Sequence, residues 1–160
     1  MSLKNILKIK LSFSLSTILI LIFFFIIFSL FINIQIQIDD MMVFASGIDL
    51  IKDIKNSQYL AIVRGEDMKF EIVDDNKFKI TYTSKDIIYI NSNPLFKSVK
   101  IKPEGLSFLI KSDGSFKIES GKDEIYLKKE NGFLEFLFNK AFSYKIKLRE
   151  DGKIFLEKGS

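Results

Sequence analysis

The sequence predicts an α+β fold, in which one long N-terminal helix precedes an antiparallel, β-sandwich-like domain. Two observations predict it. No charged residue stands between Lys10 and Asp39, and this stretch consists mainly of Ile, Leu and Phe. From Asp67 onward, apolar and polar residues alternate with the period of a strand, and turn residues separate the alternating segments.

The uncharged stretch is long enough to span a membrane, because a helix of about 20 residues crosses the hydrocarbon core. Lys4, Lys8 and Lys10 precede it and no acidic residue does, which predicts a cytoplasmic N-terminus and an extracytoplasmic C-terminal domain. The stretch is too long for a cleavable secretory signal, and the small-residue pattern Val43-Phe44-Ala45 stands well beyond its apolar centre. A plain signal anchor and a segment cut at its front edge both remain open.

We expect the helix to continue from Met41 to Val63, where apolar residues recur every three or four positions. These residues are Phe44, Ile48, Ile51, Ile54, Ala61 and Ile62. Gly65 predicts the helix end, and Gly47 makes a bend or break possible. Residues 33–38 alternate like a strand, but an unpaired strand leaving a bilayer would have unsatisfied backbone groups, so helix is predicted there too.

The C-terminal part is predicted to be a series of short strands. They lie at residues 68–72, 78–82, 106–110, 116–118, 125–127, 134–138, 144–148 and 154–156. The turns between them carry Asp74-Asp75-Asn76, Asp113-Gly114, Ser120-Gly121, Asn131-Gly132 and Asp151-Gly152, residues that favour tight hairpins. Pro94 and Pro103 are expected to bracket an irregular crossing between two groups of strands.

Composition excludes several classes of function. The chain has no Cys and no His, so it has no disulfide, no Ser-His or Cys-His catalytic pair and no ordinary zinc site. Asp74, Asp75 and Asn76 are interpreted as a turn, because the spacing of an EF-hand is absent. The formal net charge is +4, and three of the positive charges precede the apolar stretch. We therefore predict no enzyme activity, no cofactor and no metal.

The front edge of the apolar stretch, Lys10-Leu11-Ser12-Phe13-Ser14-Leu15-Ser16-Thr17, resembles the processing site of type IV pilins and pseudopilins. Those proteins have a short basic leader, a small residue and then Phe at the start of a long apolar helix. The resemblance implies cleavage between Ser12 and Phe13 by a prepilin peptidase, with Phe13 as the methylated new N-terminus. The chain departs from the family pattern at Ser12, where Gly is usual, and at Thr17, where Glu is usual.

Later segments resemble GspH/FimT-type pseudopilins and the ComGD-type minor pilin of competence systems. They are DLIKDIKNSQYLAIVRGEDMKFEI from Asp49, LSFLIKSDGSFKIESGKDEIYL from Leu106 and YKIKLREDGKIFLEK from Tyr144. Together with the patterns above, the resemblance implies a leader at 1–12, a transmembrane helix at 13–38, an amphipathic helix at 39–65 and an extracytoplasmic β domain at 66–160.

The resemblance implies a structural subunit that helps to initiate or cap a filament of a secretion, pilus or competence system. The implied partners are other pilin or pseudopilin subunits, the prepilin peptidase and the inner-membrane assembly platform. Thr17 is the expected assembly position in the helix, and a subunit without the usual Glu there fits a place at or near the filament tip. The alternative is a single-pass, signal-anchored β domain with an unrelated binding role.

Direct DNA binding is not expected. The basic candidates in the closing hairpin are Arg149, Lys153 and Lys158. Acidic residues are interleaved with them in the same hairpin, which favours a solvated mixed-charge hairpin over a phosphate-binding surface.

Overall fold

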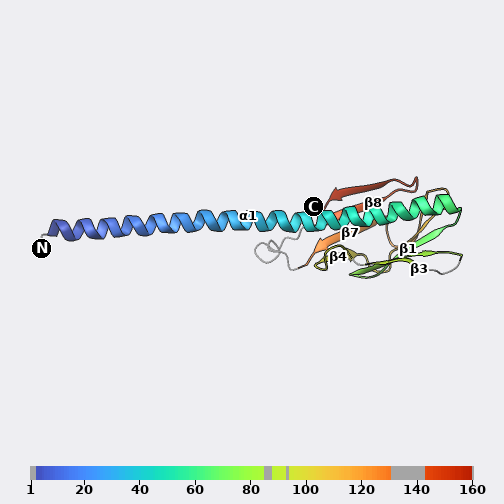
Figure 1. The fold of residues 1–160 in the computed structure, drawn as a ribbon, viewed down its shortest axis with the longest axis horizontal. Helices are drawn as coiled ribbons and strands as arrows, with labels where there is room; N and C mark the ends of the chain where they lie inside the picture. Colours follow the sequence, from blue (N-terminus) through green and yellow to red (C-terminus); the bar gives the residue numbers. More distant parts are fainter. Residues whose placement is uncertain (1–2, 85–87, 93, 131–142, 160) are drawn as a thin grey trace. The chain divides into compact units, whose positions relative to one another are not determined.

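The computed structural model describes residues 3–84, 88–92, 94–130 and 143–159, with side chains from Leu15 onward except that of Asn91. Within these residues the chain forms one helix followed by nine strands (Figure 1). They are α1 (Leu3–Arg64), β1 (Met68–Asp74), β2 (Lys77–Tyr82), β3 (Ile88–Ser92), β4 (Val99–Lys102), β5 (Ser107–Ile110), β6 (Phe116–Ser120), β7 (Glu124–Lys129), β8 (Ser143–Leu148) and β9 (Ile154–Lys158). The α+β prediction is confirmed.

The helix is continuous through residues 33–38, whose alternating pattern resembles that of a strand. Residues 33–38 belong to α1, because a helix satisfies its backbone groups internally whatever surrounds it. The helix ends as predicted at Arg64, and Gly65 has a φ of 64°. The Glu66 N–H donates to the Ala61 carbonyl over 3.1 Å, which closes the last turn of the helix.

The strands form two antiparallel sheets, one ordered β3-β2-β1-β5-β6 and the other β4-β7-β8-β9. Two strands were not predicted. β4 lies between Pro94 and Pro103, where an irregular crossing was expected, and its Val99 and Ile101 are fully buried, whereas β3 precedes Pro94. Neither is bounded by an Asn-Gly or Asp-Gly turn, the signal that marked several of the predicted strands. The predicted strand at 134–138 and the turn at Asn131-Gly132 lie outside the described residues.

The two sheets share one apolar core. Alternate residues of each strand point inward, so that Phe70 stacks on Phe108 and on Phe78 with ring centroids 4.7 and 5.5 Å apart. The outward residues of the larger sheet are charged and paired across strands. Lys69 contacts Glu119, and Lys79 contacts Glu71, each over 3.0 Å. This inside-outside alternation is what fixes the strand register.

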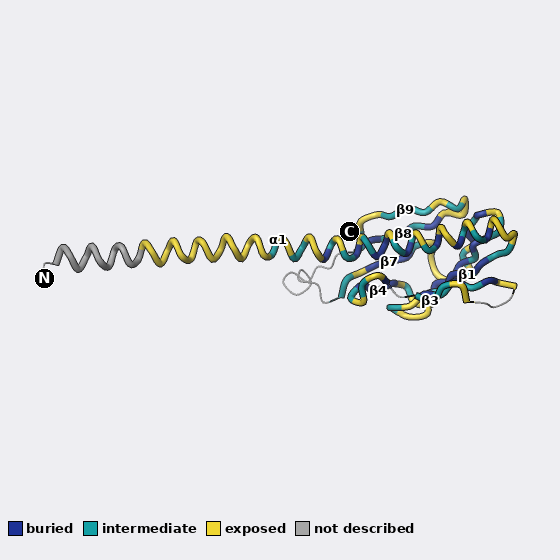
Figure 2. The backbone as a smooth tube through the Cα atoms, in the orientation of Figure 1, coloured by how far each residue is buried: buried dark blue, intermediate teal, exposed yellow. Residues whose placement is uncertain are grey.

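The part of α1 from Ile38 to Arg64 belongs to the same compact unit as the strands, and residues 1–37 form the other unit. Figure 2 shows that the helix is buried on one side in this second part. The buried residues from Val43 to Ala61 are Val43, Ser46, Gly47, Leu50, Ile54, Ser57 and Ala61. The predicted apolar stripe was therefore partly wrong, since Phe44, Ile48 and Ile62 are about half exposed. Apolar residues surround much of this helix, so periodicity alone could not say which face the sheets cover.

Small residues decide which face is buried. The helix passes through Gly47 without a break, although Gly47 had made one possible. A Cβ at Gly47 would lie 3.1 Å from the side chain of Leu156 on β9. Gly47 is thus a point of close approach between helix and sheet, and its intrinsic cost to the helix, about 1 kcal/mol against Ala, is offset by that packing.

Gln58 connects two hairpins to the helix by hydrogen bonds. Its Nε2 donates to the carbonyl of Gly114 over 2.5 Å and to the carbonyl of Gly152 over 3.0 Å. Gly114 lies in the β5–β6 turn and Gly152 in the β8–β9 turn, which belong to different sheets. One amide side chain therefore joins α1 to both sheets.

Gly152→Ala is expected to destabilise the protein more than Gly105→Ala. Both glycines have positive φ, 84° and 73°, which costs a non-glycine residue about 1–2 kcal/mol. A Cβ at Gly105 has no atom within 4 Å, whereas one at Gly152 would overlap the Gly114 carbonyl oxygen. Denaturant titration of the full chain in detergent should show the larger loss for Gly152→Ala. Equal losses would contradict the close packing of the two turns.

Candidate functional site

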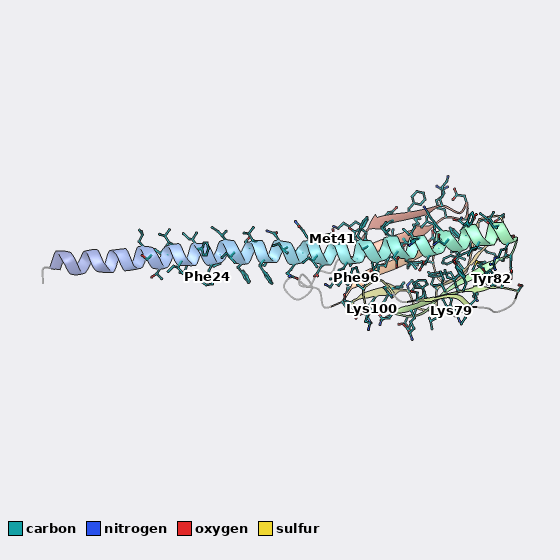
Figure 3. The ribbon with its side chains drawn as sticks, viewed as in Figure 1. Phe24, Met41, Lys79, Tyr82, Phe96 and Lys100 are labelled. Carbon is teal, nitrogen blue, oxygen red and sulfur yellow. The ribbon has the colours of Figure 1, made fainter. Side chains whose placement is uncertain are left out.

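The most unusual surface of the molecule is α1 between Leu15 and Ile38. Most side chains here are apolar and exposed, with Phe24 67% and Phe25 73% exposed (Figures 2 and 3). By length and composition this helix can cross a membrane. Such a continuous apolar surface does not remain in water.

Two environments can cover that surface. Lipid chains solvate the apolar side chains, while the helix satisfies its own backbone hydrogen bonds. Other apolar helices can replace the lipid by close packing, because the change from lipid to helix exchanges one apolar environment for another. The segment is therefore suited both to membrane anchoring and to helix–helix assembly.

The predicted processing and assembly residues all lie in this helix. Ser12 and Phe13 are within the backbone of α1, and their side chains lie outside the described ones. Thr17 is exposed, near the start of the apolar surface. Cleavage at Ser12-Phe13 and a role of Thr17 in assembly remain predictions.

A buried ion pair marks the start of the domain. Asp39, the first charged residue after the apolar stretch, is 3% exposed and bonds to the Lys129 Nζ at the end of β7. The same ammonium lies 3.6 Å from the Met42 sulfur. Because a buried charge without its partner is costly, this pair ties the first turn of the domain's helix segment to the smaller sheet.

Asp40 makes a second connection to the same sheet. It accepts a hydrogen bond from the Tyr144 hydroxyl over 3.1 Å and contacts the Lys158 ammonium over 2.9 Å. Burial, and then the hydrogen bond to Asp40, raise the pKa of Tyr144. The hydrogen bond to Asp40 likewise raises the pKa of Lys158. Sequence reasoning missed both aspartates, although their place directly after the apolar stretch was a usable signal.

The three basic residues considered for DNA contact do not form one site. Arg149 and Lys153 both pair with Asp151 in the β8–β9 turn, over 3.1 and 3.3 Å. Lys158 stands at the other end of β9, held by Asp40. The structure therefore divides these cations between two places and neutralises each locally.

The Asp74–Asn76 segment is the predicted hairpin turn. The Asn76 N–H donates to the Asp74 carboxylate over 2.8 Å, and the turn joins β1 to β2. The carboxylates of Glu71 and Glu124 lie on different sheets and pair with Lys79 and Lys145, each over 3.0 Å.

No protein-family model matches the chain, and no curated protein matches it significantly. Among solved structures, the chain is similar to the crystal structure of the type IV minor pilin FimU of Pseudomonas aeruginosa strain PAO1. The TM-score is 0.47 and the sequence identity 12%, and the match covers 72% of this chain and 87% of that chain.

Asp39→Asn is expected to lower the free energy of unfolding by about 3–5 kcal/mol, because it leaves the Lys129 ammonium without its charged partner. Lys129→Met should cost a similar amount, and the double variant should cost less than the sum of the two. Denaturant titrations of the three variants give the coupling energy. Additive losses would show that the two side chains do not stabilise each other.

Stability should also fall above about pH 10. A raised folded-state pKa means that the stabilising contribution of Tyr144 is complete below its ordinary value of about 10 and is lost as the pH rises beyond it. Tyr144→Phe should lose less stability over that range than the unaltered chain. Tyr59→Phe, at a 65% exposed position, serves as control, and an identical pH dependence of the two variants would disprove the role of Tyr144.

Proposed function

We propose that this protein is a minor pilin or pseudopilin, a structural subunit of a membrane-anchored filament and not an enzyme. One observation carries the proposal. A single helix, α1, is apolar and exposed from Leu15 to Ile38 and then contributes core residues to a β domain from Val43 to Ala61. A plain anchor needs only the first property, whereas a filament subunit needs a helix that holds its domain while its apolar part changes environment.

The subunit is stored in the cytoplasmic membrane, with the N-terminus inside and the β domain outside, as the three leading lysines favour. Assembly moves the apolar helix from lipid into contact with the helices of other subunits. The domain must follow this movement. Asp39, Asp40 and Gln58 supply polar connections from helix to sheets, so a force on the helix is transmitted to the domain.

Processing by a prepilin peptidase between Ser12 and Phe13 is part of the proposal. It removes the basic leader, which holds the lysines on the cytoplasmic side. The alternative function is that of a signal-anchored β domain with an unrelated binding role. Cleavage near Ala45 would suit neither, because Val43 and Asp39 would be lost from the domain's buried face.

The N-terminus of the protein isolated from its membrane tests processing. We expect a chain that begins at Phe13 with a methylated amine. Ser12→Gly should be processed at least as well, whereas Ser12→Lys should block cleavage and leave the leader in place. Leu11→Ile is the control that keeps the small residue. An intact Met1, or a start near Ser46, would rule out the pilin-type pathway.

Thr17→Glu tests filament position. A carboxylate at residue 17 offers an ion pair to the N-terminal amine of a neighbouring subunit, and we expect a several-fold change in incorporation into filaments. Ser16→Glu adds the same charge one position away and should not reproduce the change. Incorporation is measured by quantifying the subunit in sheared filaments. If both variants behave alike, the position of the carboxylate is irrelevant and only its charge matters.

A further inference from the structure

An open cleft of about 560 Å³ lies between the edge strand β6 and the end of β8. Its apolar lining is Phe116 and Ile118 on β6 and Leu148 on β8. The cleft is large enough for one or two aliphatic side chains, and its floor offers them an apolar surface. None of the motifs assigned to membrane anchoring or processing takes part in it.

The free edge of β6 borders this cleft. The Phe116 N–H points away from β5 and donates to the Glu150 carbonyl over 3.2 Å. Backbone groups alternate sides along a strand, so the N–H and C=O of Ile118 point the same way as those of Phe116. No backbone partner for Ile118 on that side is found within the part of the chain that the structure describes. The β8–β9 hairpin thus hydrogen-bonds to the edge of β6 at Phe116 and leaves the backbone groups of Ile118 available.

The charges around the cleft are mainly acidic. Asp123, Glu150 and Asp151 line it together with Arg149. Arg149 pairs with Asp151 over 3.1 Å, whereas Asp123 and Glu150 are exposed and have no ion pair among the described residues. Two carboxylates therefore remain to attract a cation at the rim.

We propose that this cleft binds an extended, basic segment of another protein chain. The segment adds to the edge of β6 through backbone hydrogen bonds at Ile118, places an aliphatic side chain against the partly exposed Ile118 side chain, and sets Lys or Arg beside Asp123 and Glu150. Strand addition of this kind gains affinity from the backbone and specificity from the alternate side chains. A nucleic acid fits poorly, because its phosphates would meet the two free carboxylates.

The probe is the synthetic peptide Lys-Val-Lys-Ile-Lys-Val-Lys, blocked at both ends and fluorescently labelled, with Glu-Val-Glu-Ile-Glu-Val-Glu as its matched control. Binding to the full chain in zwitterionic detergent micelles is followed by fluorescence anisotropy, with empty micelles as blank. We expect the basic peptide to bind more weakly as salt rises and the acidic peptide not to bind.

Two pairs of substitutions decide whether the cleft is responsible. Asp123→Asn with Glu150→Gln should weaken binding roughly threefold or more, because it removes both free carboxylates. Glu66→Gln with Glu157→Gln removes the same charge elsewhere and should leave binding unchanged. Ile118→Trp fills the cleft and should abolish binding. Since that change also touches the core, the charge pairs remain the deciding comparison.

Equal binding of the two peptides, equal effects of the two charge pairs, or binding of a short DNA duplex in place of the peptide would overturn the proposal. The proposal does not depend on the filament role. A chain that keeps its leader would disprove pilin-type processing and would not affect the peptide-binding result. A failure of peptide binding would likewise not affect the proposed processing.

Discussion

The fold of residues 38–160 depends on the contact between one face of α1 and the two sheets. Val43, Leu50, Ile54 and Ala61 are at most 3% exposed and belong to the same apolar cluster as the inward residues of both sheets. Without that helix face, the shared core would lose these four buried apolar side chains, and the strand side chains that they cover would be more exposed to water. The helix is therefore part of the domain core as well as a connection to the N-terminal segment.

This dual use of one helix constrains its sequence. The buried face must be narrow and small enough for strands to approach, which explains the small residues Ser46, Gly47, Ser57 and Ala61 on it. Two of the polar side chains near the core have hydrogen-bond or charged partners. The Ser57 hydroxyl donates to the Asp53 carbonyl over 2.8 Å, and Asp39 bonds to Lys129. The first bond lies within the helix, whereas the pair of Asp39 and Lys129 connects the helix to β7 and helps to fix its rotation against the smaller sheet, because it is costly to break.

The same constraint connects the helix to the proposed role. A subunit that transfers its apolar segment from lipid to a helical assembly needs a domain that remains folded during the transfer. The core residues of α1 begin at Val43, beyond the apolar stretch, so the transfer removes none of them. The cleft beside β6 is independent of that process and would allow contact with another chain on the domain itself.

Much of this organisation could be predicted from the sequence. The absence of charge between Lys10 and Asp39 predicted the long apolar helix, since a continuous helix satisfies its backbone in any environment. Glycine turns and two-residue alternation predicted seven of the strands in the described residues, because each pattern is local. The absence of His and Cys excludes whole classes of chemistry on composition alone.

Only the tertiary structure decided what depends on contacts distant in the sequence. It showed that Gly47, and not Ile48, faces the sheets, because Leu156 of β9 approaches there. It paired Asp39 with Lys129 and joined Gln58 to two separate turns. It also brought β6 beside the end of β8, which forms the cleft. The sequence by itself determined the helix and seven of the described strands, since those preferences are local. The strands β3 and β4, the buried face of the helix and the cleft follow from packing between segments up to about a hundred residues apart.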